Sequence, residues 1–221
     1  MHFEKKHLFL VLYFIIAAVH LFMGQMPEVS FLSKIALIPA LAAWLWFNDI
    51  DKAYKKLLFL ALFFSWIGDL LLGLQSINSN FFIFGLLAFL SAHCFYISLN
   101  LKNIGFKISI PIILATLPML GWAAYLLKMS HEKAGGFFIP IIAYAFILCM
   151  LYYSTIIARE KFSRMNWAIL FYGVVLFISS DSMIAINKFI VKMPFFDFAI
   201  MFTYIIAQFM IVFSYLRNFK R

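Results

Sequence analysis

Residues 57–74 read LLFLALFFSWIGDLLLGL, an apolar run of 18 residues in which Asp69 carries the one charge. A helix of about 20 such residues crosses the roughly 30 Å of hydrocarbon in a bilayer. The whole chain has this character: of its 221 residues 66% are hydrophobic and 12% are charged, and the mean hydropathy is +0.99. A soluble domain is about half apolar and one quarter charged. The composition therefore excludes a soluble domain and predicts a protein whose solvent is lipid.

Apolar runs of similar length recur along the chain and predict an all-α, polytopic membrane helix bundle that forms a single domain over residues 1–221. Strands are excluded because the runs are too long and do not alternate, whereas a helix satisfies its own backbone in lipid. About eight transmembrane helices are expected, over residues 8–24, 29–47, 57–74, 81–101, 108–127, 137–158, 166–187 and 197–216. The segments between them, such as 48–56 and 129–136, are too short to fold alone, so any chemistry uses side chains on the helices or at their ends.

The basic residues predict the orientation of these spans. The chain has 18 Lys and Arg against 9 Asp and Glu, and most of the basic residues fall in the two terminal tails and after the second, fourth and sixth spans. The positive-inside rule then predicts that both termini lie in the cytoplasm, in a multi-pass protein of the cell or inner membrane. No nucleic-acid partner is expected, because the sequence contains no basic helix or aromatic-basic module to bind one.

Two acidic residues lie inside expected spans, Asp69 in the third and Asp181 within FISSDSMI, residues 177–184, of the seventh. An acid near the membrane centre costs about 2.5–3.5 kcal/mol, so it is expected to face the bundle interior and to have a function there. Spans three and seven run in the same direction, and both acids lie roughly 7–9 Å below the outer surface. We therefore expect the two carboxylates to meet. The structural alternative is that each only hydrogen-bonds a neighbouring helix.

His93 is a third candidate, near the middle of the span 81–101, and Tyr96 and Asn100 lie on its helical face. Lys34 lies near the outer end of the second span. It either extends to the interface, holds an anionic headgroup, or pairs with one of the two aspartates. The remaining polar candidates in the spans are Tyr144, Asn187, Tyr204 and Gln208.

The sequence contains no Gly-x-Ser-x-Gly, no His-Glu-x-x-His, no phosphate-binding loop and no zinc-ligand spacing of Cys and His. A zinc site would have to gather four side chains from four helices: His20, His93, Asp69 and Asp181. We therefore expect no metal site.

Five segments, taken in order, resemble the lysoplasmalogenase (YhhN-like) family of integral membrane hydrolases, and the resemblance covers about residues 30–216. The segments are 64–72 (FSWIGDLLL), 85–89, 92–96 (AHCFY), 180–189 (SDSMIAINKF) and 204–208 (YIIAQ). One departure is Ile35, where the family often has proline, although Pro39 follows closely.

The resemblance implies an ether hydrolase of lipid metabolism that cleaves the vinyl ether of lysoplasmalogens. The products would be a fatty aldehyde and glycerophosphoethanolamine or glycerophosphocholine. The partner would be a lysophospholipid substrate in the bilayer, with no cofactor, no metal and no obligate protein partner.

Vinyl ether cleavage needs one neutral acid, one ionised base and a water molecule, as does the two-carboxylate chemistry of glycosidases. Two buried carboxylates that share one proton provide this pair without a metal. We interpret Asp181 as the acid and Asp69 as the base, with His93 and Tyr96 orienting water or substrate. Lys34 would bind the phosphate.

Two alternatives remain open from the sequence. A proton-coupled membrane transporter of a small or lipid-like substrate would also use buried acids and a histidine. A binding bundle without chemistry would pair its buried acids with lysine instead.

Overall fold

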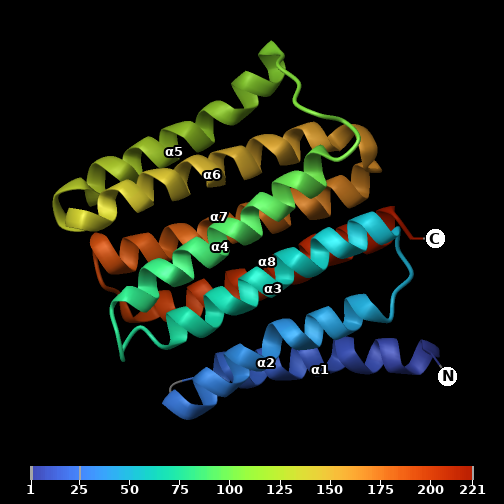
Figure 1. The fold of residues 1–221 in the computed structure, drawn as a ribbon, viewed down its shortest axis with the longest axis horizontal. Coiled ribbons are helices and arrows are strands. Elements are labelled where there is room, and N and C mark those ends of the chain that lie inside the picture. Colours follow the sequence, from blue (N-terminus) through green and yellow to red (C-terminus); the bar gives the residue numbers. More distant parts are fainter. Residues whose placement is uncertain (1, 25, 221) are drawn as a thin grey trace. The chain divides into compact units, whose positions relative to one another are not determined.

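The computed structural model describes residues 2–24 and 26–220, and the side chains from residue 7 onward (Figure 1). Within this part of the chain the structure forms eight α-helices, two short 3₁₀ segments and no strand; an isolated bridge pairs Ile50 with Lys220. The helices are α1 (His2–Met23), α2 (Pro27–Trp46), α3 (Lys52–Gly73), α4 (Asn80–Leu101), α5 (Ile110–Ala134), α6 (Phe138–Ile157), α7 (Arg164–Phe189) and α8 (Pro194–Asn218). The predicted all-α class is confirmed.

Six helical stretches of the described residues are long and apolar enough to cross a membrane, so the protein is a multi-pass membrane protein. One of them, Ile110–Lys161, contains both α5 and α6. The chain turns between these two helices at Gly135, where φ is +50°, and α6 then packs back against α5 (Figure 1). The apolar part of α1, His7–Met23, is shorter. Eight crossings and cytoplasmic termini stay predictions.

Several of the expected connecting segments are partly helical, which corrects the predicted boundaries. Helix α1 begins at His2 rather than at residue 8, and α8 begins at Pro194 rather than at residue 197. Helix α3 begins at Lys52 rather than at residue 57, because the Asp51 carboxylate caps it by accepting a hydrogen bond from Ala53 N at 3.0 Å. Helix α5 continues to Ala134, through most of the segment 129–136 that was expected to be a connection. The break comes at Gly135, since glycine readily adopts the positive φ that ends a helix.

The described chain forms two compact units, one built from residues up to Phe95 together with the chain from Tyr215 onward, the other from Tyr96–Ser214. Helices α4 and α8 each contribute to both units. A single domain over residues 1–221 stays a prediction, and its residues 1, 25 and 221 lie outside the described part.

In the first unit α2 packs against both α1 and α3, and glycines bring α3 and α4 close together. A Cβ atom on Gly68 would lie 2.5 Å from the Phe89 ring, and one on Gly85 would lie 2.9 Å from the Leu72 side chain. Only glycine fits such close approaches. Because α3 and α4 are antiparallel, this register places His93 near the level of Phe64, roughly 7–8 Å along α3 from Asp69.

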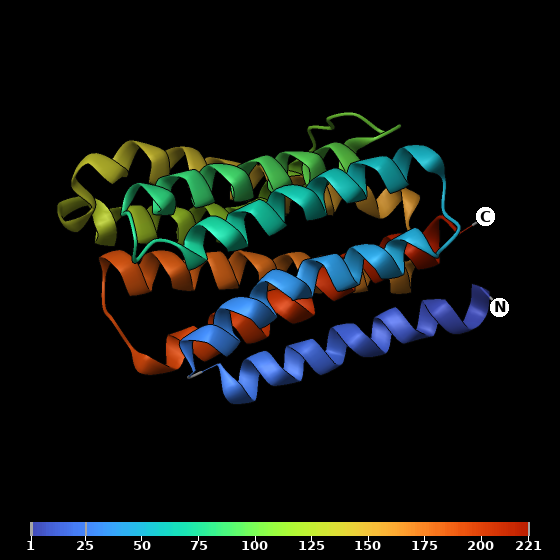
Figure 2. The ribbon, with the colours of Figure 1, turned by 60° about the horizontal axis from the view of Figure 1, so that its bottom comes forward.

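The start of α1, the α2–α3 turn and the end of α8 lie at the same end of the first unit (Figures 1 and 2). The Phe9 ring stacks on Phe47 with centroids 5.3 Å apart, and the Phe219 ring stacks on Tyr54 at 4.1 Å. Asp51 N also donates to Phe219 O at 3.4 Å. An even number of membrane crossings would likewise bring the two chain ends to the same side of the membrane.

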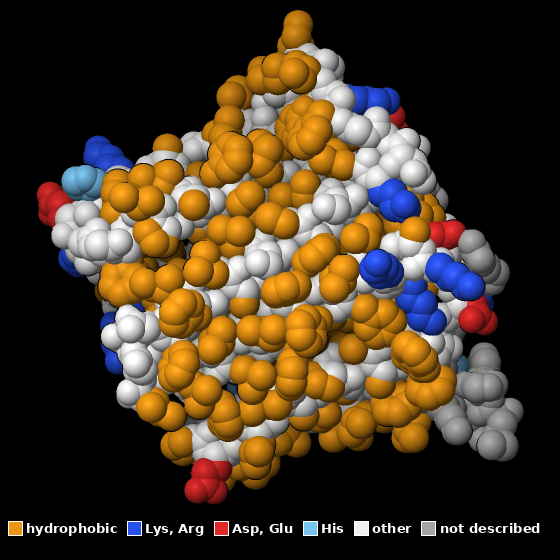
Figure 3. Space-filling model, viewed as in Figure 1, with side chains coloured by type: hydrophobic (Ala, Val, Ile, Leu, Met, Phe, Trp, Pro, Cys, Tyr) orange, Lys and Arg blue, Asp and Glu red, His pale blue; other side chains and the backbone are white. Residues whose placement is uncertain are grey.

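In the second unit α7 packs against α5 and α6, and α8 approaches α7 at Gly173, which faces Met210 and Ile211. Asn100 near the end of α4 donates hydrogen bonds to the hydroxyls of Ser154 and Thr155 on α6, both at 3.0 Å. In both units hydrophobic side chains cover much of the visible helix surface, and charged side chains gather near helix ends (Figure 3). Such a surface suits contact with lipid.

Candidate active-site residues

Asp69 lies on α3 in the first unit and is 3% exposed. The Lys34 ammonium on α2 lies 3.7 Å from its Oδ1 atom, and the Lys34 side chain remains 20% exposed. Of the roles that the sequence left open for Lys34, the structure thus shows pairing with Asp69. A carboxylate at this depth needs such a counter-charge. Because the ion pair is longer than a hydrogen bond and Lys34 is partly exposed, the ammonium can also reach an anionic group beside it.

The position of Lys34 depends on an interaction between α2 and α3. Pro39 lies inside α2 and has no backbone N–H, so the carbonyl of Ile35 lacks its usual helical donor. The indole N–H of Trp66 donates to this carbonyl at 2.9 Å. Trp66 lies three residues before Asp69 on α3, and Ile35 directly follows Lys34. Pro39 stands out in the sequence, whereas the role of Trp66 depends on packing between helices and has no signal there.

The two membrane histidines have different surroundings. His93 on α4 is fully buried, near the level of Phe64 on α3. His20 on α1 contacts Ser33 Oγ through its Nδ1 atom at 2.8 Å, and Ser33 also donates to Val29 O. His20 therefore links α1 to α2. Within the described residues no group of three or more His, Cys, Asp or Glu side chains could hold a metal ion.

Asp181 lies on α7 in the second unit and is 6% exposed. The Tyr144 hydroxyl on α6 donates to its Oδ2 atom at 2.8 Å. The residues on either side fix α7 further. Ser180 donates to Ile200 O of α8 at 3.0 Å, and Ser182 accepts from the Trp122 indole of α5 at 3.0 Å. Three successive residues of α7 thus bind three different helices, which holds this carboxylate in place.

Three further predicted residues lie together in the second unit. The Tyr96 hydroxyl donates to Gln208 Oε1 at 2.6 Å. The Phe177 ring meets Tyr96 at 6.1 Å and Tyr204 at 5.5 Å between centroids, both in edge-on contacts. Tyr204 and Gln208 are neighbours on α8, as their spacing predicts. All four side chains are buried.

Asn187 has different neighbours from the other predicted residues. Its Nδ2 atom donates to Asp197 Oδ1 at 3.3 Å, and its Oδ1 atom accepts from Met193 N at 3.2 Å. These bonds close the turn between α7 and α8. Asn187 lies about 9 Å further along α7 than Asp181.

The sequence matches the YhhN family over residues 29–215. The chain belongs to the YhhN family. The resemblance noted from the sequence is thereby confirmed, and every candidate from Lys34 to Gln208 lies within the matched region. His20 lies before it, on the helix α1.

Curated relatives of this YhhN-family chain in three mammals carry the name lysoplasmalogenase TMEM86B. The mouse protein is 31% identical over 196 residues, which cover 88% of this chain and 78% of the relative. The rat protein is 30% identical over 211 residues, covering 93% and 83%, and the human protein is 29% identical over 195 residues, covering 88% and 78%. No solved structure matches the chain.

Proposed function

We propose that this YhhN-family protein is a lysoplasmalogenase that hydrolyses the vinyl ether bond of a lysophospholipid within the cell or inner membrane. The observation that carries the proposal is the pair of buried aspartates, Asp69 and Asp181. Lys34 beside Asp69, a pairing that a binding bundle would also have, is in this proposal the charge that keeps the base ionised. Relatives named lysoplasmalogenase over most of both chains support the choice of substrate.

The proposed reaction begins with protonation of the vinyl ether carbon that is β to the oxygen, which gives an oxocarbenium ion. Water attacks the adjacent carbon and gives up one proton to the base. The hemiacetal then collapses to a fatty aldehyde and a free hydroxyl on glycerophosphoethanolamine or glycerophosphocholine. The net change is the addition of one water molecule, which needs no oxidant, and the two carboxylates would supply both proton transfers without a metal or other cofactor. A carboxylate pair suits this sequence, as in glycoside hydrolysis.

The polar partners assign different roles to the two aspartates in this proposal. Asp69 has the Lys34 ammonium 3.7 Å away, so it is the ionised base that receives the proton from water. Asp181, whose Oδ2 atom accepts from the Tyr144 hydroxyl, would be the acid. The mechanism requires the two carboxylates to act on the same vinyl ether.

The other candidates would bind or orient the substrate. His93, on the neighbouring helix α4, would orient the attacking water. Lys34 would also hold the phosphate. The remaining proposed substrate-binding residues are Tyr96, Tyr144, Asn187, Tyr204 and Gln208. Of these, Tyr96 and Gln208 already bind each other, so they would shape the site as a unit.

Replacing either carboxylate with an amide tests the dyad. Asp69→Asn and Asp181→Asn should each lower kcat for a defined lysoplasmalogen by at least about a thousandfold, because each step of proton transfer loses its group. Aldehyde release from purified protein is the measurement, and the melting temperature in detergent checks folding. Asp49→Asn, at an exposed position, is the matched control and should keep full activity.

Near-wild-type turnover in either amide variant would exclude the two-aspartate mechanism. Chelators should leave turnover unchanged, and a loss of activity that only zinc restores would exclude the metal-free mechanism. Uptake of intact lipid into proteoliposomes without aldehyde release would favour the transporter.

A further inference from the structure

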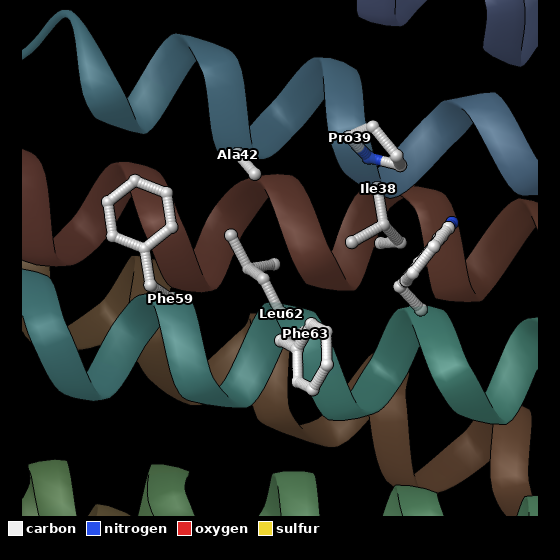
Figure 4. A pocket seen from close by; sticks show the side chains of 7 residues that line it. Ile38, Pro39, Ala42, Phe59, Leu62 and Phe63 are labelled. Carbon is white, nitrogen blue, oxygen red and sulfur yellow. The ribbon is translucent and has the colours of Figure 1, made fainter.

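A pocket of about 160 Å³ lies between α2 and α3 in the first unit (Figure 4). Figure 4 shows side chains of α2 on one side and of α3 on the other. The lining residues are Ile38, Pro39, Ala42, Phe59, Leu62, Phe63 and Trp66. None of these side chains is charged.

The chemistry of the lining restricts what the pocket can bind. Among the seven lining side chains the Trp66 indole N–H is the one hydrogen-bonding group, and it already donates to Ile35 O at 2.9 Å. A polar ligand would therefore bury polar atoms without partners, which costs roughly 1–3 kcal/mol for each. The pocket suits a hydrocarbon.

The pocket begins one helical turn from the Lys34–Asp69 pair. Ile38 lies four residues after Lys34 on α2, and Trp66 lies three residues before Asp69 on α3, so each shares a helical face with its polar neighbour. Phe63 is 50% exposed and Pro39 is also exposed, so the pocket has an edge on the surface that faces lipid. A charged pair beside an apolar pocket matches a molecule with a polar head and one hydrocarbon chain.

We propose that this pocket binds the part of the alkenyl chain that follows the vinyl ether, when the headgroup of the lysolipid is at Lys34. The proposal rests on the proposed function and adds the subsite for the chain. An apolar cavity of about 150 Å³ holds a benzene-sized molecule, so the pocket accepts about six carbons. The rest of the chain stays in the bilayer and leaves the pocket at Phe63.

The pocket is expected to orient the substrate more than to increase its binding affinity. Transfer of a chain from lipid to an apolar pocket yields little hydrophobic free energy, because lipid is as apolar as the pocket. Packing of the first carbons against Ile38 and Leu62 instead fixes where the vinyl ether lies relative to Asp69. The expected consequence is a larger effect on kcat than on KM when the pocket is filled.

Photo-crosslinking tests binding without turnover. The probe is a saturated alkyl-ether lysolipid with a diazirine at the sixth chain carbon, incubated with the purified full-length protein. Adducts should map to α2 and α3 at the lining residues, and excess lysoplasmalogen should reduce them at least about tenfold. Equal labelling by a diacyl phospholipid probe, absence of competition, or adducts elsewhere would overturn the proposal in favour of ordinary boundary lipid.

Filling the pocket tests its role in turnover. Ala42→Phe should lower kcat at least about tenfold for a sixteen-carbon alkenyl chain and leave a two-carbon vinyl ether, which cannot reach the pocket, unchanged. Ala42→Leu serves if the larger side chain prevents folding, and Ala115→Phe, at an exposed position of α5, is the matched control. Equal loss for both chain lengths, or no loss, would contradict the subsite.

The two proposals fail in different ways. Specific, competed labelling in a protein that releases no aldehyde would support the pocket and exclude the hydrolase. Aldehyde release without competed labelling would support the hydrolase and exclude the pocket.

Discussion

Pro39 removes one hydrogen bond from α2, and Trp66 on α3 replaces it with a bond between the helices. In lipid no water can satisfy the Ile35 carbonyl, so the indole is needed there. This contact lies one residue from Lys34 on α2 and three residues from Asp69 on α3. The hydrogen bond that the Ile35 carbonyl needs therefore also holds the two helices where Lys34 and Asp69 pair.

A double-mutant cycle tests this replacement. Trp66→Phe should lower the free energy of unfolding by about 1–3 kcal/mol, because a buried carbonyl loses its donor. In the Pro39→Ala background the same change should cost about 1 kcal/mol less, since alanine restores the backbone N–H. Thermal unfolding in detergent measures both. An equal loss in the two backgrounds would show that the indole contributes only packing.

Lys34 has two roles in the account, as counter-charge to Asp69 and as ligand for the phosphate. Lys34→Gln should raise KM for lysoplasmalogen about tenfold and also lower the melting temperature, because the phosphate loses its ligand and the buried Asp69 carboxylate loses its counter-charge. Lys192→Gln, at an exposed position before α8, is the control. A lower melting temperature with unchanged KM would mean that the ion pair is structural, as a binding bundle without chemistry would have it.

At the scale of helices, the approach of α3 to α4 sets the level of His93 beside Asp69. Gly68→Ala would place a Cβ atom 2.5 Å from the Phe89 ring, so the buried ring or the helices must shift. We expect a loss of about 1–3 kcal/mol in unfolding free energy, together with reduced turnover. Gly121→Ala on α5, where nothing lies within 4 Å, should be neutral or stabilising. Equal stability of the two variants would contradict the close packing.

The sequence predicted the existence of every helix because each long apolar run has one physical solution in lipid. It misplaced the ends of α3 and α5, because the Asp51 cap and the Gly135 turn decide these ends and hydropathy does not register them. A helix can extend beyond the hydrocarbon of the bilayer, so the apolar run in the sequence is shorter than the helix that contains it.

The candidate site was predictable in part. A charged or polar group in an apolar run stands out, and this signal found Asp69, Asp181 and Tyr144. Partners that come from another helix carry no such signal. Trp122, which donates to Ser182 beside Asp181, and Trp66 were therefore missed, since tryptophan is common in membrane spans.

For the whole molecule, the two aspartates belong to different compact units, Asp69 to the first and Asp181 to the second. Each has its own polar partner within its unit, Lys34 for the one and Tyr144 for the other. The surroundings of each carboxylate are therefore set within its own unit.

The most direct test is mass spectrometry of the products that the purified protein forms from a defined lysoplasmalogen in D₂O, beside the saturated alkyl-ether analogue. Authentic aldehyde in the same buffer controls for exchange. The account predicts a fatty aldehyde with one deuterium on the carbon next to the carbonyl, an equal amount of the glycerophospho product, and no change in the analogue. No aldehyde, an aldehyde without deuterium, or cleavage of the analogue would contradict it.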